Sequence, residues 1–208
     1  MSFFKRVKEN TDERFHRYFP ESLESVDQLH FNYLDQPTAV LITDKLQSKE
    51  PPHVVRQFLM ESSEVQASGQ ELKAIFLECV FSRARKSLEH VKKSVEVFYN
   101  QIFEPWFINA SDARQSQFTL LTTVASIWQR NQSRCLQVIE KLWQVGVIEA
   151  ENGVAWALKC LKDDSSLFKG YDSSIHVQVI ALMTQRTFEK TAFLLTLYNQ
   201  RGYIGQLA

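Results

Sequence analysis

The side chains best suited to metal chemistry in this sequence are three cysteines and a histidine that stand far apart. Cys79, Cys135, Cys160 and His176 are ligand types that zinc prefers, but structural zinc sites use closely spaced pairs. The sequence contains no C-x-x-C and no H-E-x-x-H, so these side chains could meet only through folding. Each cysteine also stands inside an apolar helical pattern, which is typical of reduced, buried thiols in an intracellular protein. We therefore expect no metal site.

The loops that enzymes use to hold phosphate or to activate a serine are also missing. There is no G-x-G-x-x-G, no G-x-x-x-x-G-K-[ST] and no G-x-S-x-G. The segment from Gly202 to Gly205 matches the bare G-x-x-G of RNA-binding KH domains, but no predicted strand flanks it. We predict a protein that is not an enzyme and has no cofactor; an enzyme with a dispersed site remains the alternative.

One group of basic residues could bind phosphate or acidic side chains. It crosses the expected turn between two helices, where Lys86, His90 and Lys93 fall on one helical face. The group could contact an acidic partner or RNA phosphate, but Glu89 and Glu96 interrupt it, which favours an ordinary solvated turn. The candidate contacts to a partner or to RNA are Arg83, Arg85, Lys86, His90 and Lys93.

The composition is that of a soluble globular protein. The chain has 208 residues, of which 44% are hydrophobic and 23% charged, and its few Gly and Pro residues disfavour an all-β fold. The 24 basic and 24 acidic residues cancel, which argues against a protein that coats nucleic acid. The N-terminal residues turn charged at once, unlike a signal peptide, and no run of 18 apolar residues occurs. We therefore expect an intracellular protein outside the membrane.

Helical periodicity dominates the chain after an aperiodic beginning. Residues 1–35 are polar and aromatic, so we expect a poorly ordered lead-in before a single helical-repeat domain over 36–208. Pro37 can occupy the first turn of one helix, and Pro51 and Pro52 are expected to open a second, short helix. A break near Ser87 separates two helices whose hairpin ends at Glu104-Pro105-Trp106, and Gly146 is placed to end a later helix. The helix after Glu149 should bury one face, formed by Val154, Ala157, Leu158 and Leu161.

Successive helices joined by short turns predict an all-α fold, a HEAT-like α-solenoid of antiparallel helix pairs. No strict sequence period occurs, which excludes a consensus tetratricopeptide or ankyrin array. Of the four tryptophans, Trp106 follows a helix end and the others lie within helices, so we expect core positions; one left partly exposed would anchor a partner. The predicted core includes Leu121, Trp128, Ile139, Leu142 and Trp156.

A pattern of placed residues between Thr119 and Leu161 is similar to a known family. It contains Ile127-Trp128-Gln129-Arg130-Asn131, then Glu140-Lys141-Leu142, Val147-Ile148-Glu149 and Val154-Ala155-Trp156. In these segments the chain resembles the middle helical-repeat domain of the large subunit of the nuclear cap-binding complex. Upstream, Ser87 to Phe98 and Thr38 to Phe58 are similar to preceding helices of that family, so the resemblance covers about residues 36 to 165.

The resemblance implies a fold, a role and a location. The fold would be the helical repeat named after the middle domain of eukaryotic initiation factor 4G. The chain would act in the nucleus as a scaffold that braces a small RNA-recognition-motif subunit, which itself holds the RNA cap, and that supports mRNA processing and export. The first repeat of the family and the long insertion of its third are absent, so we expect a fragment or a short relative.

Two other functions stay open beside the cap-binding reading. A generic HEAT-like adaptor of translation or mRNA decay would have the same fold and a different partner, and would be cytoplasmic. Direct RNA binding through the basic turn would show a steep salt dependence that is lost on replacing Lys86 and Lys93. Neither reading requires a metal, a cofactor or a membrane.

Overall fold

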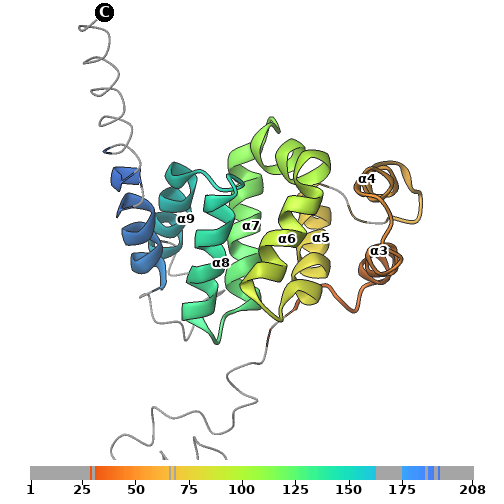
Figure 1. Cartoon of the computed structure of the whole chain (residues 1–208), viewed down its shortest axis with the longest axis horizontal. Helices are drawn as coiled ribbons and strands as arrows, with labels where there is room; N and C mark the ends of the chain where they lie inside the picture. The colour runs from red at the N-terminus through yellow and green to blue at the C-terminus, as the bar shows by residue number, and fades with distance from the viewer. Residues whose placement is uncertain are drawn as a thin grey trace, which may run out of the picture.

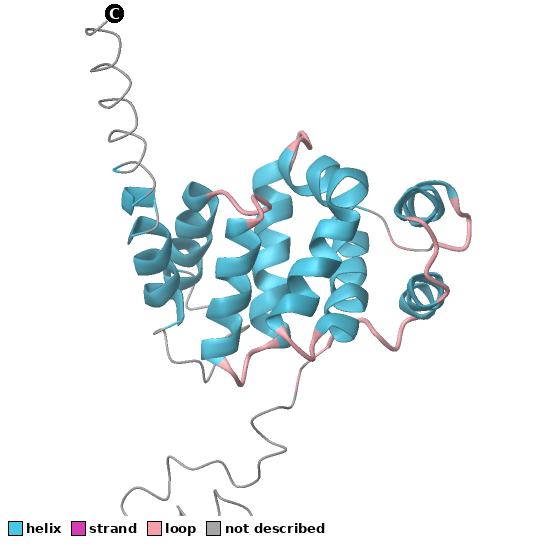
Figure 2. Ribbon diagram, viewed as in Figure 1, coloured by secondary structure: helices cyan, strands magenta, loops and turns pink. Residues whose placement is uncertain are grey.

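Helices make up the regular structure of the residues described by the computed structural model, which are 29, 31–65, 67, 69–162, 175–185, 187–189 and 192 (Figure 2). In chain order the elements are α3 (Pro37–Gln47), α4 (Pro52–Glu61), α5 (Gly69–Ala84), α6 (Leu88–Phe98), the π-helix η2 (Tyr99–Ile108), α7 (Ala113–Ile127), α8 (Gln132–Gln144) and α9 (Ala150–Lys162). Residues 175–185 form a further helical segment. None of the described helices has the length and apolar character needed to cross a lipid bilayer.

The helices pack as successive antiparallel pairs. Figure 1 shows α5 to α9 standing side by side, with α3 and α4 seen end-on at one end of the row and the blue segment after residue 175 at the other. Helix α5 packs on α3, α6 and α7, and α7 packs on α8, α9 and η2. The expected all-α fold of stacked helix pairs is confirmed.

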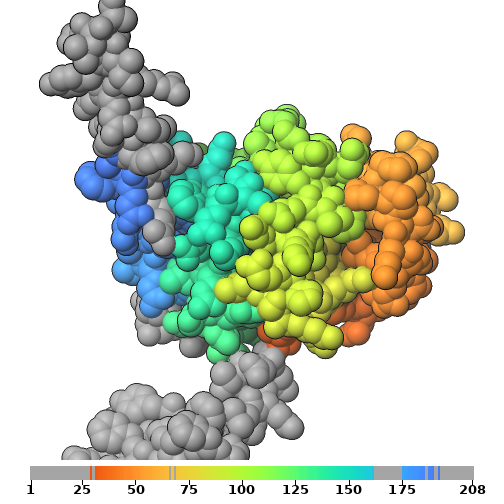
Figure 3. Space-filling model, in the orientation of Figure 1, coloured from red at the N-terminus to blue at the C-terminus, as the bar shows by residue number. Residues whose placement is uncertain are grey.

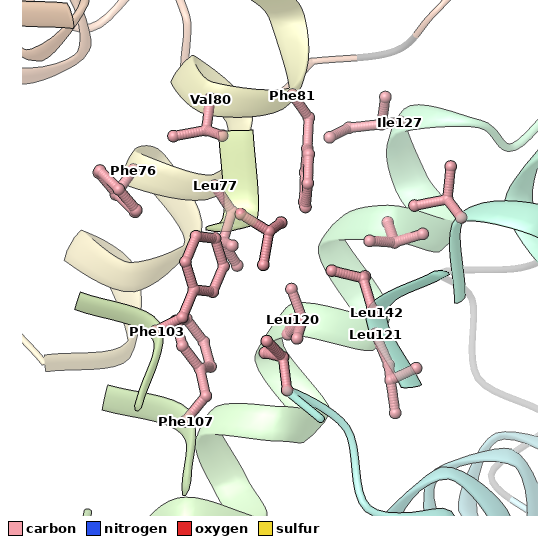
Figure 4. Packing of buried hydrophobic residues seen from close by; sticks show 14 of the residues in the cluster. Phe76, Leu77, Val80, Phe81, Phe103, Phe107, Leu120, Leu121, Ile127 and Leu142 are labelled. Atoms are coloured by element: carbon pink, nitrogen blue, oxygen red, sulfur yellow. The ribbon is translucent and has the colours of Figure 1, made fainter. Parts of the chain in front are cut away.

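Helix α5 lies at the centre and is buried on nearly every side. Lys73, Leu77 and Glu78 are buried together with the apolar residues, because α3, α6 and α7 surround this helix. Figure 4 shows where α5, η2 and α7 meet around Phe76, Phe103 and Phe107. The Phe76 and Phe103 ring centroids lie 6.1 Å apart, and those of Phe103 and Phe107 5.6 Å apart. These aromatic contacts join two successive helix pairs.

The chain does not leave its helix at Glu104-Pro105-Trp106, where the sequence predicted an end. It continues as the π-helix η2, which contains Pro105 and ends at Ile108. The Asn109 N–H donates to the Glu104 carbonyl, five residues back, at 2.9 Å. A proline supplies no N–H, and the wider π turn accommodates the altered hydrogen-bond register. The π turn carries Phe103, Trp106 and Phe107 into the core.

The buried face of α9 also differs from the predicted one. Leu158 and Leu161 are exposed, whereas Asn152, Gly153, Trp156 and Ala157 are buried. Two neighbours explain why a different face of α9 is buried, because α7 covers one side of this helix and the segment 175–185 covers another. A Cβ at Gly153 would lie 3.2 Å from the Met183 Cγ, so glycine permits this close approach.

Residues expected in the poorly ordered lead-in are partly held against the core. The buried Glu78 carboxylate accepts hydrogen bonds from the backbone N–H groups of Asn32 and Tyr33 at 2.8–3.0 Å. Leu29, Phe31, Tyr33 and Leu34 pack against the core. Residues 1–28 and 30 of the expected lead-in lie outside the described residues.

The buried His176 should make the fold less stable in mild acid. Its ring lies 5.2 Å from that of Trp156, and burial lowers the pKa of His176 below its usual value of 6.5. The unfolded chain therefore takes up a proton before the folded chain does, so stability is complete above about pH 6.5 and falls as the pH drops through that value. One proton limits the slope to about 1.4 kcal/mol per pH unit. Urea melts at about pH 7.5 and 5.5 should show this loss, and His176→Gln should reduce it.

Candidate interaction groove

The turn between α5 and α6 is fixed by the serine that the sequence placed at the break. Ser87 is the N-cap of α6, and its hydroxyl accepts the His90 N–H at 3.2 Å. The same hydroxyl contacts the His90 Nδ1 at 2.5 Å. The cap holds the imidazole at the first turn of α6, on the side where a groove opens.

This groove has a volume of about 380 Å³ and lies between three parts of the chain. The loop after α3, the end of α5 and the outer side of α6 form its walls. On the face drawn in Figure 3, the orange surface of α3 and α4 meets the yellow surface of α5 and α6. We call it the α3–α6 groove. Its lining residues are Leu46, Lys49, Glu50, Pro51, Pro52, Val80, Arg83, His90, Lys93, Ser94, Val97 and Phe98.

The structure brings together three of the five candidate basic residues. Arg83, His90 and Lys93 line the groove, whereas Arg85 and Lys86 are exposed at the helix turn and do not line it. Sequence reasoning missed the opposite wall, which runs from Lys49 to Pro52. Its only sequence signal was the Pro-Pro start of α4, which predicts a helix boundary and says nothing about a neighbour some 40 residues away.

The charges of the groove are predominantly positive. Lys49, Arg83 and Lys93 contribute three formal cations, and Glu50 contributes the one carboxylate among the lining residues. Glu50 lies 4.0 Å from the Lys45 Nζ, and Lys45 is not a lining residue. Within the described residues, Arg83 and Lys93 form no ion pair. The groove therefore offers cations that an acidic group from outside could pair with.

The backbone places one of these cations at a position that usually favours glycine. Lys49 follows the C-cap of α3 with φ of 54°, in the left-handed region, where helices often end with glycine. We expect Lys49→Gly to stabilise the fold by about 0.5–1 kcal/mol, because glycine removes the steric cost of this conformation. Urea denaturation measures the change. A loss of stability larger than about 0.5 kcal/mol would show instead that the lysine side chain supports the fold.

The groove also has an apolar part. Leu46 and Val80 are buried, Phe98 is half-buried, and Val97 is 57% exposed. The neighbouring Val95 points into the core with no exposure, so the exposed Val97 belongs to the outer side of α6. This surface can therefore offer a partner both apolar contacts and ion pairs.

Comparison with known families decides which kind of domain carries this groove. A family model described as MIF4G like matches residues 35–191, which is more than half of the chain. The chain belongs to the MIF4G-like family. No curated protein matches the chain. MIF4G-type domains are helical scaffolds that mediate protein–protein interactions in mRNA-related complexes, and they are generally not enzymes.

The MIF4G-like domain buries the five residues predicted for its core. Leu121, Ile139 and Leu142 have no exposure, Trp128 is 2% exposed and Trp156 is 1% exposed. Trp128 is the C-cap of α7 and so lies just after the helix instead of inside it. Trp106 is buried as well. Trp143 on α8 is half-buried, so of the four tryptophans it best fits the partly exposed position expected of a partner anchor.

The thiols of the MIF4G-like domain should differ sharply in reactivity. Burial raises the pKa of Cys79 to about 11 and that of Cys135 to about 12, so both stay protonated at neutral pH. Cys160 is half-buried on α9. We expect a maleimide to label Cys160 in the folded protein and the other two only after denaturation, as read by mass spectrometry of tryptic peptides. Rapid labelling of Cys135 in the native protein would contradict its burial.

No metal-binding cluster of His, Cys, Asp or Glu occurs in the described part of the domain. The groove described above is lined mainly by basic and apolar side chains.

Proposed function

We propose that this chain is a non-catalytic scaffold module of a nuclear cap-binding complex large subunit. In this role it braces a small RNA-recognition-motif subunit that holds the RNA cap, and it supports mRNA processing and export in the nucleus. Membership of the MIF4G-like family supports the scaffold role and an mRNA-related complex. The cap-binding identity is supported by the residues that carry the resemblance.

The observation that carries the proposal is the position of the two tryptophans of that pattern. Trp128 packs on Phe81 with ring centroids 5.8 Å apart, so it joins the end of α7 to α5. The Trp156 Nε1–H donates to the Thr122 hydroxyl at 3.0 Å, so it joins α9 to α7. Each tryptophan thus connects successive helix pairs. A scaffold that braces a partner needs this fixed spacing between repeats, because a partner reads the shape of several pairs at once.

The polar residues of the same pattern lie outside the core. Glu140 and Lys141 on α8 are partly exposed, and Lys141 donates to the Gln144 side chain at 3.1 Å. The pattern therefore combines internal tryptophans with a polar outer surface on α8. Such a surface is suited to contact a partner without being needed for folding.

The test is retention of the purified chain on beads that carry capped RNA. With the small subunit present, the chain should be retained, and without it or on uncapped RNA the chain should wash through. Retention on both RNAs without the small subunit would contradict the proposal and favour direct RNA binding. No retention under any condition would favour a generic adaptor of translation or mRNA decay, which has the same fold and a different partner.

A further inference from the structure

The α3–α6 groove has a definite chemistry that the cap-binding proposal does not use. Cations line its rim, apolar side chains lie beside them, and three separate parts of the chain enclose it. Its volume of about 380 Å³ lies at the lower end of ligand pockets and suits one or two side chains of a peptide. We ask which occupant satisfies both the charge and the apolar surface.

We propose that the α3–α6 groove binds an extended, acidic segment of a partner protein that carries one apolar side chain among its carboxylates. The inference does not depend on which mRNA-related complex contains the chain. It assigns a surface to the protein-binding role and names the chemistry of the segment that the surface accepts.

Charge complementarity is the first argument for an acidic occupant. Lys49 and Arg83 lie on opposite walls of the groove, on the α3–α4 loop and at the end of α5, and Lys93 extends the α6 wall. Carboxylates on a chain that runs between the walls could pair with cations from both sides. Glu50, the one lining carboxylate, lies next to Lys45 outside the groove, so part of its charge is already balanced.

The exposed valine is the second argument, and it favours a peptide over RNA. Val97 is 57% exposed beside the half-buried Phe98, so an apolar side chain of the occupant would remove both from water. RNA-binding surfaces instead use several aromatic platforms and runs of phosphate contacts. The lining residues of the groove include only two rings, those of His90 and Phe98, and not a series of stacking platforms.

The backbone of Lys49 is the third argument. A lysine occupies a left-handed position that glycine would occupy at less steric cost, and its side chain lines the groove. The residue thus supplies a rim charge that the turn itself does not require.

The chain offers matched variants for the test. Arg83→Glu/Lys93→Glu reverses two lining cations, and Arg85→Glu/Lys86→Glu reverses two exposed cations nearby that do not line the groove. Val97→Ser removes an apolar contact in the groove, and Val40→Ser makes the same change at a 50% exposed position that is not a lining residue. All of these positions are exposed, so thermal melts should stay close to that of the unmodified chain.

The probes are three fluorescein-labelled molecules measured by anisotropy against the full chain. One is an acidic peptide of alternating Glu and Ser with a central Leu, the second has Ala in place of that Leu, and the third is oligouridylate RNA. The Leu peptide should bind best. Arg83→Glu/Lys93→Glu should weaken it at least about tenfold, and Val97→Ser about threefold. Both control variants should change the affinity by less than about twofold.

Three results would overturn the inference. The first is failure of the Leu peptide to bind the unmodified, folded chain. The second is an equal loss of affinity in the groove variant and the Arg85→Glu/Lys86→Glu control, because this would show general electrostatic attraction. The third is tighter binding of the RNA than of either peptide. The first two results do not bear on retention with capped RNA, so the groove proposal can fail while the cap-binding proposal stands. The third result would also predict retention on uncapped RNA and would count against both proposals.

Discussion

Replacing Trp156 with alanine should destabilise the fold by about 3–5 kcal/mol. The side chain is 1% exposed, its ring lies 5.2 Å from that of His176, and its Nε1–H donates to Thr122 at 3.0 Å. The substitution leaves a cavity between α7, α9 and the segment 175–185, and it leaves a hydroxyl without its donor. Equilibrium urea unfolding followed by far-ultraviolet circular dichroism measures the loss.

Two further substitutions on α9 sharpen this test. Leu158→Ala changes a residue that is 46% exposed, so it should cost less than about 1 kcal/mol. Trp156→Phe keeps an aromatic ring and removes the donor, so it separates the hydrogen bond from the packing. An unchanged melt of Trp156→Ala would contradict the placement of this residue between successive helix pairs.

Replacing Gln117 with leucine should have an effect of similar size, about 3–5 kcal/mol, although the two side chains are close in volume. Gln117 has no exposure, and its Nε2–H donates to the Phe107 carbonyl at 2.9 Å. Its Oε1 accepts the Glu149 N–H at 3.0 Å and an Asn152 Nδ2–H at 3.1 Å. This one amide therefore joins the end of η2 to the start of α9. Leucine would leave the Phe107 carbonyl and the Glu149 N–H without this partner and would remove one of the two hydrogen bonds of the Asn152 amide, in a confined space.

The matched control for this prediction lies two residues away on the same helix. Gln115 is exposed, so Gln115→Leu makes the same chemical change outside the core and should alter stability by less than about 0.5 kcal/mol. Urea unfolding of both variants gives the difference directly. Equal stability of the two variants would show that the Gln117 hydrogen bonds contribute nothing to joining the repeats.

Local chemistry made several helix ends predictable from the sequence. Gly146, expected to end a helix, has φ of 80° and donates to the Trp143 carbonyl, while the Val147 N–H donates to the Leu142 carbonyl. This hydrogen-bond pair is the Schellman motif that glycine favours. The break predicted near Ser87 is also found, and Ser87 is the N-cap of α6. These features depend on a few adjacent residues, so a single sequence contains the information.

Features that depend on distant neighbours could not be predicted in the same way. The sequence indicated Leu158 and Leu161 for the core, but the packing of α7 and the segment 175–185 selected Asn152, Gly153 and Trp156. A buried asparagine is unfavourable in any local pattern, and it is satisfied here by Gln117, 35 residues earlier. The same holds for Glu78, which is buried because it pairs with the backbone of residues 32 and 33.

The candidate site illustrates the same division. The basic residues near the α5–α6 turn were visible in the sequence, and an ordinary solvated turn was the favoured interpretation. The structure separates them into Arg83, His90 and Lys93, which line a groove, and two residues that remain at the turn. The separation follows from the position of the α3–α4 loop, because Lys49 to Pro52 form the second wall of the groove. No local pattern carries that information.

Titration calorimetry can decide whether this MIF4G-like chain is a scaffold for a cap-binding partner, as we propose. The purified small RNA-recognition-motif subunit of the nuclear cap-binding complex is titrated into the full chain. We expect saturable binding of one subunit per chain with a Kd below about 10 µM. Absence of binding at about 100 µM of both proteins, with the chain folded by circular dichroism, would contradict it.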